Sequence, residues 1–183
     1  MPRSASPPHL CLDHTTYRIG RGETGVLTIE AYKSVLLPLW RFRTPAIARA
    51  SSASLWEAFL DYEKSDDFVG MDMTRKFLQM GMTRAKRYAN HKGGKKYKAG
   101  ANGEGKREMI EVSEGKNWKG REEKEQASAI FRGVWERARC YKSYLEKKTV
   151  FVKRQKEWDR ERKAEEGRKT KESKTKPERK GHG

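Results

Sequence analysis

The chain has 183 residues, of which 37% are charged and only 34% hydrophobic, and its formal net charge is +17. This length is sufficient for one domain with a hydrophobic core, and the excess charge indicates a solvated tail beside it. Two distant cysteines exclude a disulfide framework, and no cofactor or metal site is expected because the four histidines lack zinc-ligand spacing. The longest apolar run, Val35 to Trp40, is too short to span a bilayer. We therefore expect an intracellular protein, cytoplasmic or nuclear.

The N-terminal quarter predicts a leader and a hairpin. Residues 1–14 are rich in Ser, Pro and His, which is typical of a disordered leader. Thr16 to Ile19 and Val26 to Tyr32 are rich in β-branched and apolar residues and flank a glycine-rich turn, which predicts a β-hairpin. Val35 to Phe42 is apolar and aromatic, so we expect it to be buried, and Pro38 prevents a regular long helix there.

Three helices are predicted after the hairpin. The first begins at Thr44–Pro45, a capping residue followed by a residue suited to the first turn, and ends near Lys64. The second begins after Asp66–Asp67 and fades by His91. The third begins near Arg121, with apolar residues at helical spacing as far as Leu145. Glycines inside the second helix predict that another element approaches it closely.

These elements predict an α+β, mainly α fold with three principal helices and a small N-terminal β-hairpin. The folded domain is expected over residues 15–145, interrupted by a Gly/Lys-rich loop at 92–120 with a short strand at 108–112. Residues 146–183 are expected to form a basic charged tail that is partly helical and then disordered.

A basic block covers the second predicted helix and the start of the loop. No acidic residue occurs between Asp72 and Glu104, so its cations are not balanced locally. Their arrangement predicts an exposed face opposite Met73, Phe77 and Met80, which could bind phosphates of nucleic acid or another polyanion. The candidate residues of this block are Arg75, Lys76, Arg84, Lys86, Arg87, Asn90, Lys92, Lys95 and Lys96. Arg21, Arg41 and Arg43 are candidates that extend the surface.

The same block also fits a solvated helix face followed by a basic loop, and the sequence leaves both interpretations open. Tyr88 is in phase with Phe77 and Met80, which favours a core position over a role in base stacking. The tail from Lys153 contains 13 Lys or Arg and 7 Asp or Glu, a net charge of +6. Such tails are commonly just solvated, but this one could also strengthen nonspecific binding or act as a nuclear import signal.

No catalytic motif was found, so a non-enzyme is favoured. Gly20 to Gly25 is glycine-rich but lacks the Gly-Lys-Ser/Thr ending of a phosphate-binding loop. Two alternatives to nucleic-acid binding remain. One is a protein-interaction or scaffold module that uses an exposed tryptophan, and the candidates are Trp40, Trp56 and Trp135. The other is an enzyme acting on a phosphorylated small molecule, in a pocket that holds Arg21, Arg41 or Arg84 beside a carboxylate.

Several stretches resemble a known family. They are Tyr17-Arg-Ile-Gly-Arg-Gly-Glu-Thr-Gly-Val-Leu, Tyr32-Lys-Ser, Leu37-Pro-Leu-Trp-Arg-Phe-Arg-Thr-Pro, Asp67-Phe-Val-Gly-Met-Asp-Met and the whole run from Arg75 to Tyr97. Together with the helix from Ala127 to Tyr144, they resemble domain of unknown function 4385 over residues 15–145. The resemblance implies a single cytoplasmic-type domain with no established activity and no catalytic residue. It also implies that the glycine turn, the Trp-Arg-Phe segment and the basic helix belong to one folded unit.

Overall fold

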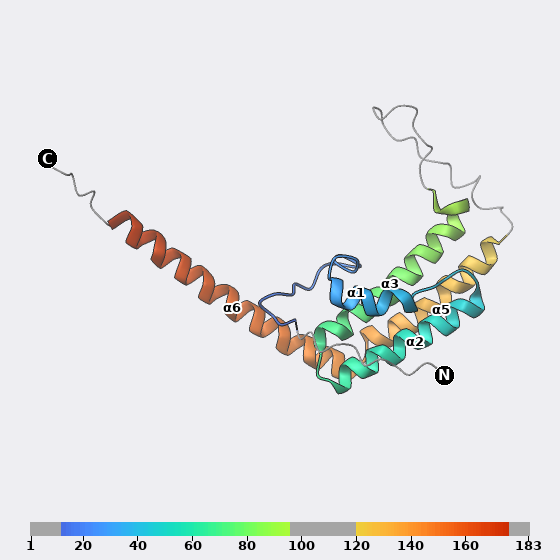
Figure 1. Cartoon of the computed structure of the whole chain (residues 1–183), viewed down its shortest axis with the longest axis horizontal. Coiled ribbons are helices and arrows are strands. Elements are labelled where there is room, and N and C mark those ends of the chain that lie inside the picture. The colour runs from blue at the N-terminus through green and yellow to red at the C-terminus, as the bar shows by residue number, and fades with distance from the viewer. Residues whose placement is uncertain (1–11, 96–119, 176–183) are drawn as a thin grey trace, which may run out of the picture.

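A chain of helices accounts for most of the residues that the computed structural model describes, which are 12–95 and 120–175. In order, these are α1 (Glu30–Leu36), the 3-10 turn η1 (Leu37–Leu39), α2 (Pro45–Lys64), α3 (Phe68–Asn90), the 3-10 turn η2 (Lys92–Gly94), α5 (Arg121–Arg139) and α6 (Lys142–Thr175). Figure 1 shows α2, α3 and α5 side by side, with α6 running away from them.

The predicted β-hairpin is wrong, and with it the α+β fold class. No strand occurs in the described residues, and α1 and α6 add to the three helices that were expected. Residues 14–16 form one turn and residues 22–28 form consecutive turns instead, in which the amides of Thr24, Val26 and Thr28 each donate to the carbonyl three residues earlier. Gly22 and Gly25 supply the positive φ values of 62° and 86° that such turns require. A short apolar run suits a strand and a buried turn or helix equally well, so periodicity alone misassigned it.

Local signals placed α2 and α3 correctly. The Thr44 side chain accepts a hydrogen bond from the amide of Ile47, and Pro45 opens α2. The Asp67 carboxylate accepts from the amide of Gly70 at 2.8 Å and caps α3. Both caps satisfy amides that have no partner inside their own helix.

The central helix is α3, which is buried between α2 and α5. Aromatic and aliphatic side chains from all three helices form the core, including Leu55, Phe59, Phe77, Leu78 and Phe131, all fully buried. Removing this much apolar surface from water is the main stabilising contribution to the bundle.

Two glycines allow neighbouring aromatic rings to lie directly on the α3 backbone. A methyl group at Gly70 would overlap the Tyr62 ring from α2, and one at Gly81 would overlap the Phe131 ring from α5. The expectation that glycines in this helix permit a close approach is therefore confirmed.

The third predicted helix is divided in two. α5 ends at Arg139, where the amides of Cys140 and Tyr141 donate to Glu136 and Ala138, and α6 starts afresh at Lys142. This turn redirects the chain, so that α6 leaves the bundle at an angle (Figure 1).

The first half of α6 packs on the N-terminal segment. Tyr144 and Phe151 are buried, and Phe151 meets the Tyr17 ring edge-on. The Arg18 guanidinium donates two hydrogen bonds to Asp159, at 2.6 and 2.9 Å. From Arg160 to Thr170 every residue is exposed. Contacts with the bundle therefore continue to Asp159, beyond the domain boundary expected at residue 145, and the rest of α6 projects into solvent.

Candidate nucleic-acid interface

The first two cations of the predicted basic face, Arg75 and Lys76, are directed into the protein. Lys76 is fully buried, and the Arg75 side chain is only 12% exposed. Both contact Asp72, which lies one helical turn earlier and is itself fully buried. Nitrogen to carboxylate distances are 2.9 Å from Arg75 and 3.5 Å from Lys76. The exposed face predicted for α3 therefore does not include these two residues.

Two tyrosine hydroxyls complete this buried ionic cluster. The Tyr17 hydroxyl accepts a hydrogen bond from Lys76 at 2.8 Å and donates to Asp72. The Tyr144 hydroxyl donates to Asp72 at 2.7 Å and accepts from Arg75 at 3.0 Å. Each hydroxyl thus uses both its donor and its acceptor capacity. The cluster joins the N-terminal segment, α3 and α6, and it has a structural role.

The pKa values in the cluster follow from burial and from these contacts. Burial acts to raise the pKa of Asp72, but the positive charge of Arg75 and the Tyr17 hydrogen bond outweigh it and lower that pKa. Burial lowers the pKa of Lys76, with Asp72 opposing the change. Burial raises the pKa of Tyr17 and of Tyr144, so both hydroxyls remain protonated donors.

Farther along α3, Lys86 is also paired. Its ammonium lies 2.7 Å from Glu125 of α5 and is 44% exposed. The neighbouring Thr83 hydroxyl donates to Glu23 of the N-terminal segment. Carboxylates that are distant in the sequence therefore neutralise part of the segment that contains no acid of its own.

The C-terminal end of α3 is different, because its arginines meet no carboxylate in the described part of the chain. Arg84 is half-buried and Arg87 is exposed. Arg87 Nε donates to the carbonyl of Gly94 at 2.8 Å. This hydrogen bond orients the guanidinium group and leaves its two terminal nitrogens available to a ligand. Lys95 is exposed just beyond. Cations also offset the partial negative charge at a helix C-terminus, which stabilises this end of α3.

Two further cations join these arginines around one aromatic pair. The Phe42 and Tyr88 rings pack edge to face with centroids 5.4 Å apart. The Lys124 ammonium from α5 lies 5.7 Å from the Phe42 ring centre and donates to the carbonyl of Arg43. Gly94, which holds Arg87, lies against the Tyr88 ring. Arg84 precedes Tyr88 by one helical turn on α3. We name these four cations, Arg43, Arg84, Arg87 and Lys124, the α3 rim.

The charges within the α3 rim repel one another. Burial lowers the pKa of Lys124, and the nearby Arg43 lowers it further, while Glu123 acts in the opposite direction. Bringing like charges together costs free energy that an anion would recover.

The remaining predicted site residues lie elsewhere. Arg41 donates to the carbonyls of Leu37 and Trp40, so its side chain caps η1. Arg21 is exposed in the N-terminal turns, and Asn90 is half-buried at the end of α3. Lys92 is the first residue of η2. Lys96 lies outside the described residues, and so do most of the predicted Gly/Lys-rich loop and the strand predicted within it. The α3 rim includes Lys124, which the sequence did not suggest.

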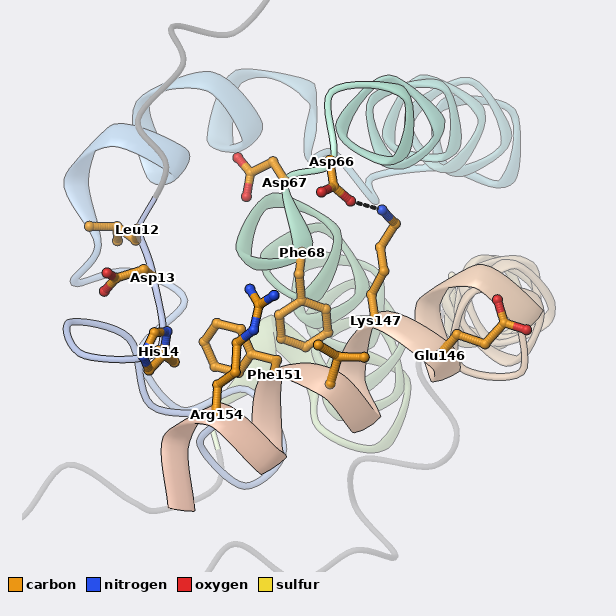
Figure 2. Close-up of a pocket in the computed structure, with 11 residues that line it drawn as sticks. Leu12, Asp13, His14, Asp66, Asp67, Phe68, Glu146, Lys147, Phe151 and Arg154 are labelled. Carbon is orange, nitrogen blue, oxygen red and sulfur yellow. Dashed lines mark hydrogen bonds and ion pairs between the residues drawn. The ribbon is translucent and has the colours of Figure 1, made fainter. Parts of the chain in front are cut away.

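A pocket of about 450 Å³ lies between the N-terminal segment, the start of α3 and α6 (Figure 2). Its carboxylates are engaged in local contacts: Asp66 pairs with Lys147, and Asp67 accepts from Tyr32 at 2.7 Å. Hydrogen bonds from Thr15 and Thr16 lower the pKa of Asp13 to about 2. None of Arg21, Arg41 and Arg84 lines this pocket, so it does not have the arrangement expected for an enzyme acting on a phosphorylated molecule.

The three tryptophans considered as binding anchors are half-buried and packed against the core. Trp40 contacts Phe42, Trp56 stacks on Phe59, and Arg137 lies 4.0 Å from the centre of the Trp56 ring. Arg139 covers Trp135 in the same way. These rings belong to the domain's own packing, so none of the three is presented as an exposed anchor.

Within residues 12–95 and 120–175, no three His, Cys, Asp or Glu side chains gather as a metal site would require. In the same ranges, no helix combines the length and the apolar character needed to cross a membrane.

Comparison with known proteins gives one match. The model of a family described as a domain of unknown function, DUF4385, matches residues 9–154. The chain belongs to this family. No curated protein and no solved structure matches it.

The DUF4385 match contains the whole bundle, the buried ionic cluster and the α3 rim, and it ends within α6 before Trp158. The family resemblance inferred from the sequence is therefore confirmed. The family description assigns no activity, so a role for this DUF4385 domain has to be argued from its surface.

Proposed function

We propose that this DUF4385 protein binds nucleic acid through phosphate contacts made by the α3 rim, with little reading of base sequence. The observation that carries the proposal is the gathering of four cations from three separate segments around the Phe42–Tyr88 pair. α3 neutralises Arg75, Lys76 and Lys86 against buried or facing carboxylates, but Arg84 and Arg87 meet no carboxylate among the described residues.

The chemistry of the α3 rim suits phosphate oxygens. Arginine presents several N–H donors in a planar fork that matches phosphate, and three of the four side chains are arginines. Contacts of this kind hold any nucleic acid backbone and release its counterions. Of the phosphate-binding residues predicted from the sequence, Arg75, Lys76 and Lys86 are left out of this proposal because they already have carboxylate partners.

The test compares two full-length variants of equal charge. Arg84→Gln with Arg87→Gln removes two rim charges. Lys64→Gln with Lys142→Gln removes two exposed charges near the start of α3, the opposite end of the helix; their side chains are 76% and 90% exposed. Binding to duplex DNA, duplex RNA and single strands is measured by fluorescence anisotropy over a range of salt concentrations.

We expect the rim variant to lower the slope of log affinity against log salt by about 1.8 in magnitude for duplex DNA. At 0.1 M salt this corresponds to a loss of affinity of up to about 60-fold. The control should change the slope much less. Equal losses in both variants would mean that net charge alone attracts the polyanion, and a wild-type slope near zero would remove the proposal.

A further inference from the structure

The solvent side of α6 carries a stripe of cations. At about 100° per residue, Lys153, Lys156, Arg160 and Lys163 fall within an arc of about 80° around the helix axis. All four are exposed. No acidic residue lies within that arc, but two border it: Glu157 at about 40° from Lys153 and Asp159 at about 40° from Lys163. We name these four residues the α6 stripe.

Some charges on the other sides of α6 are paired, whereas those of the α6 stripe make no ion pair with any described residue. Arg162 lies 3.7 Å from Glu166, and Lys169 lies 2.7 Å from Glu165. Asp159, the carboxylate nearest to Lys156 and Lys163 along the helix, already binds Arg18 through two hydrogen bonds. A helix that only needed solubility could distribute its charges evenly, whereas this one separates them by face.

The stripe is held in a fixed direction. Gln155 donates to the carbonyl of Tyr17 at 2.8 Å. Arg18 forms an ion pair with Asp159, and its guanidinium lies over the Trp158 ring. Around the helix axis Trp158 lies opposite the stripe and Gln155 about 120° from its centre, while Asp159 borders it, so the stripe itself makes no contact with the N-terminal segment. From Lys153 to Lys163 the helix rises about 15 Å, which is long enough to face several phosphates of a duplex.

The residue types in the stripe favour a double helix over single strands and membranes as the polyanion that it binds. It contains no aromatic side chain, so it cannot stack on the bases of a single strand. It contains no large apolar side chain either, so it lacks the insertion that anchors an amphipathic helix in a bilayer. What it offers is a straight row of positive charge, which complements the regular phosphates of a double helix.

We infer that the α6 stripe is a second phosphate-binding surface, specific for double-stranded nucleic acid. The inference rests on the proposed function and adds to it: α6 is an arm that lengthens the contact along a duplex.

The experiment uses the full chain and two triple variants of equal charge on one helix. Lys153→Gln, Lys156→Gln and Arg160→Gln remove three of the four charges of the stripe. Arg162→Gln, Arg168→Gln and Lys169→Gln remove cations that interact with Glu165 or Glu166. Circular dichroism checks that both variants keep their helix content. Binding is measured to duplex DNA, duplex RNA, a single strand of the same length, and vesicles containing anionic lipid.

We expect the stripe variant to reduce the magnitude of the salt slope on a duplex by about 2.7, and the control variant to reduce it by less than half as much. Binding to the single strand should change less than binding to the duplex. Equal losses in the two variants would overturn the inference, as would loss of vesicle binding without loss of duplex binding.

The two proposals fail separately. If the α3 rim variant loses duplex binding but the stripe variant behaves like its control, the inference falls and the proposed function stands. If only the stripe variant loses binding, the rim assignment falls and the inference stands. A wild-type chain that binds neither a duplex nor a single strand would overturn both.

Discussion

Replacing Asp72 with asparagine is expected to lower the free energy of unfolding by about 3–5 kcal/mol, because it leaves two cations without their counter-charge. Lys76 is fully buried and the Arg75 side chain is only 12% exposed, so neither can be fully hydrated unless the N-terminal segment or α6 separates from α3. Urea or guanidinium unfolding followed by circular dichroism measures the loss.

Two controls separate this effect from ordinary ion pairing. Asp61→Asn breaks the exposed pair with Lys64 and should cost less than about 1 kcal/mol. Asp72→Asn combined with Lys76→Met removes the second charge as well and should recover part of the loss. If Asp72→Asn costs no more than Asp61→Asn, the ionic cluster is not buried as described.

The same carboxylate predicts how stability depends on pH. Because the pKa of Asp72 is lowered in the folded protein, its contribution is complete above the unfolded value of about 3.9 and is lost as the pH falls through the lower folded value. We therefore expect the difference in unfolding free energy between the wild type and Asp72→Asn to narrow only below about pH 4. Denaturant midpoints measured from pH 7 to pH 2.5 test this, and a constant difference over that range would contradict it.

The sequence predicted the helices whose ends carry local signals and misjudged features that depend on distant contacts. Thr44, Pro45 and Asp67 lie at the helix starts themselves, so their chemistry could be recognised directly. The turns after Tyr17 gave no such signal, because α3 holds them from a distance: the Lys76 ammonium donates to the Tyr17 hydroxyl and to the Thr24 carbonyl.

The basic block is a second case in which contacts between distant residues decided what the sequence could not predict. No acid lies between Asp72 and Glu104, yet Asp72 itself precedes Arg75 by three residues and Lys76 by four, the spacings at which helical side chains meet. That spacing could have predicted the ion pairs from the sequence. The burial of these pairs could not be predicted, because it depends on Tyr17 and Tyr144, which lie 55 and 72 positions from Asp72. Lys124 joined the α3 rim through an equally distant contact, with Arg43.

The second large effect is expected at the contact between α3 and α5. Phe131→Ala should lower the free energy of unfolding by about 3–5 kcal/mol, since the ring is fully buried and its removal leaves a cavity. The Phe131 ring lies directly against the α3 backbone at Gly81, where any side chain would overlap it. Phe131→Leu provides a milder background in which the domain retains more of its stability.

A second substitution, Gly81→Ala, tests the contact between Phe131 and Gly81 through the sign of its effect on the free energy of unfolding. In the wild type, Gly81→Ala should destabilise by about 1–3 kcal/mol, because the added methyl group forces the ring aside despite the better helix propensity of alanine. With Phe131→Ala the ring is gone, and the same Gly81→Ala should stabilise by up to about 1 kcal/mol. Unfolding of the four members of this cycle measures the coupling. An equal effect of Gly81→Ala in both backgrounds would show that Phe131 does not lie on Gly81, because only direct contact can reverse the sign.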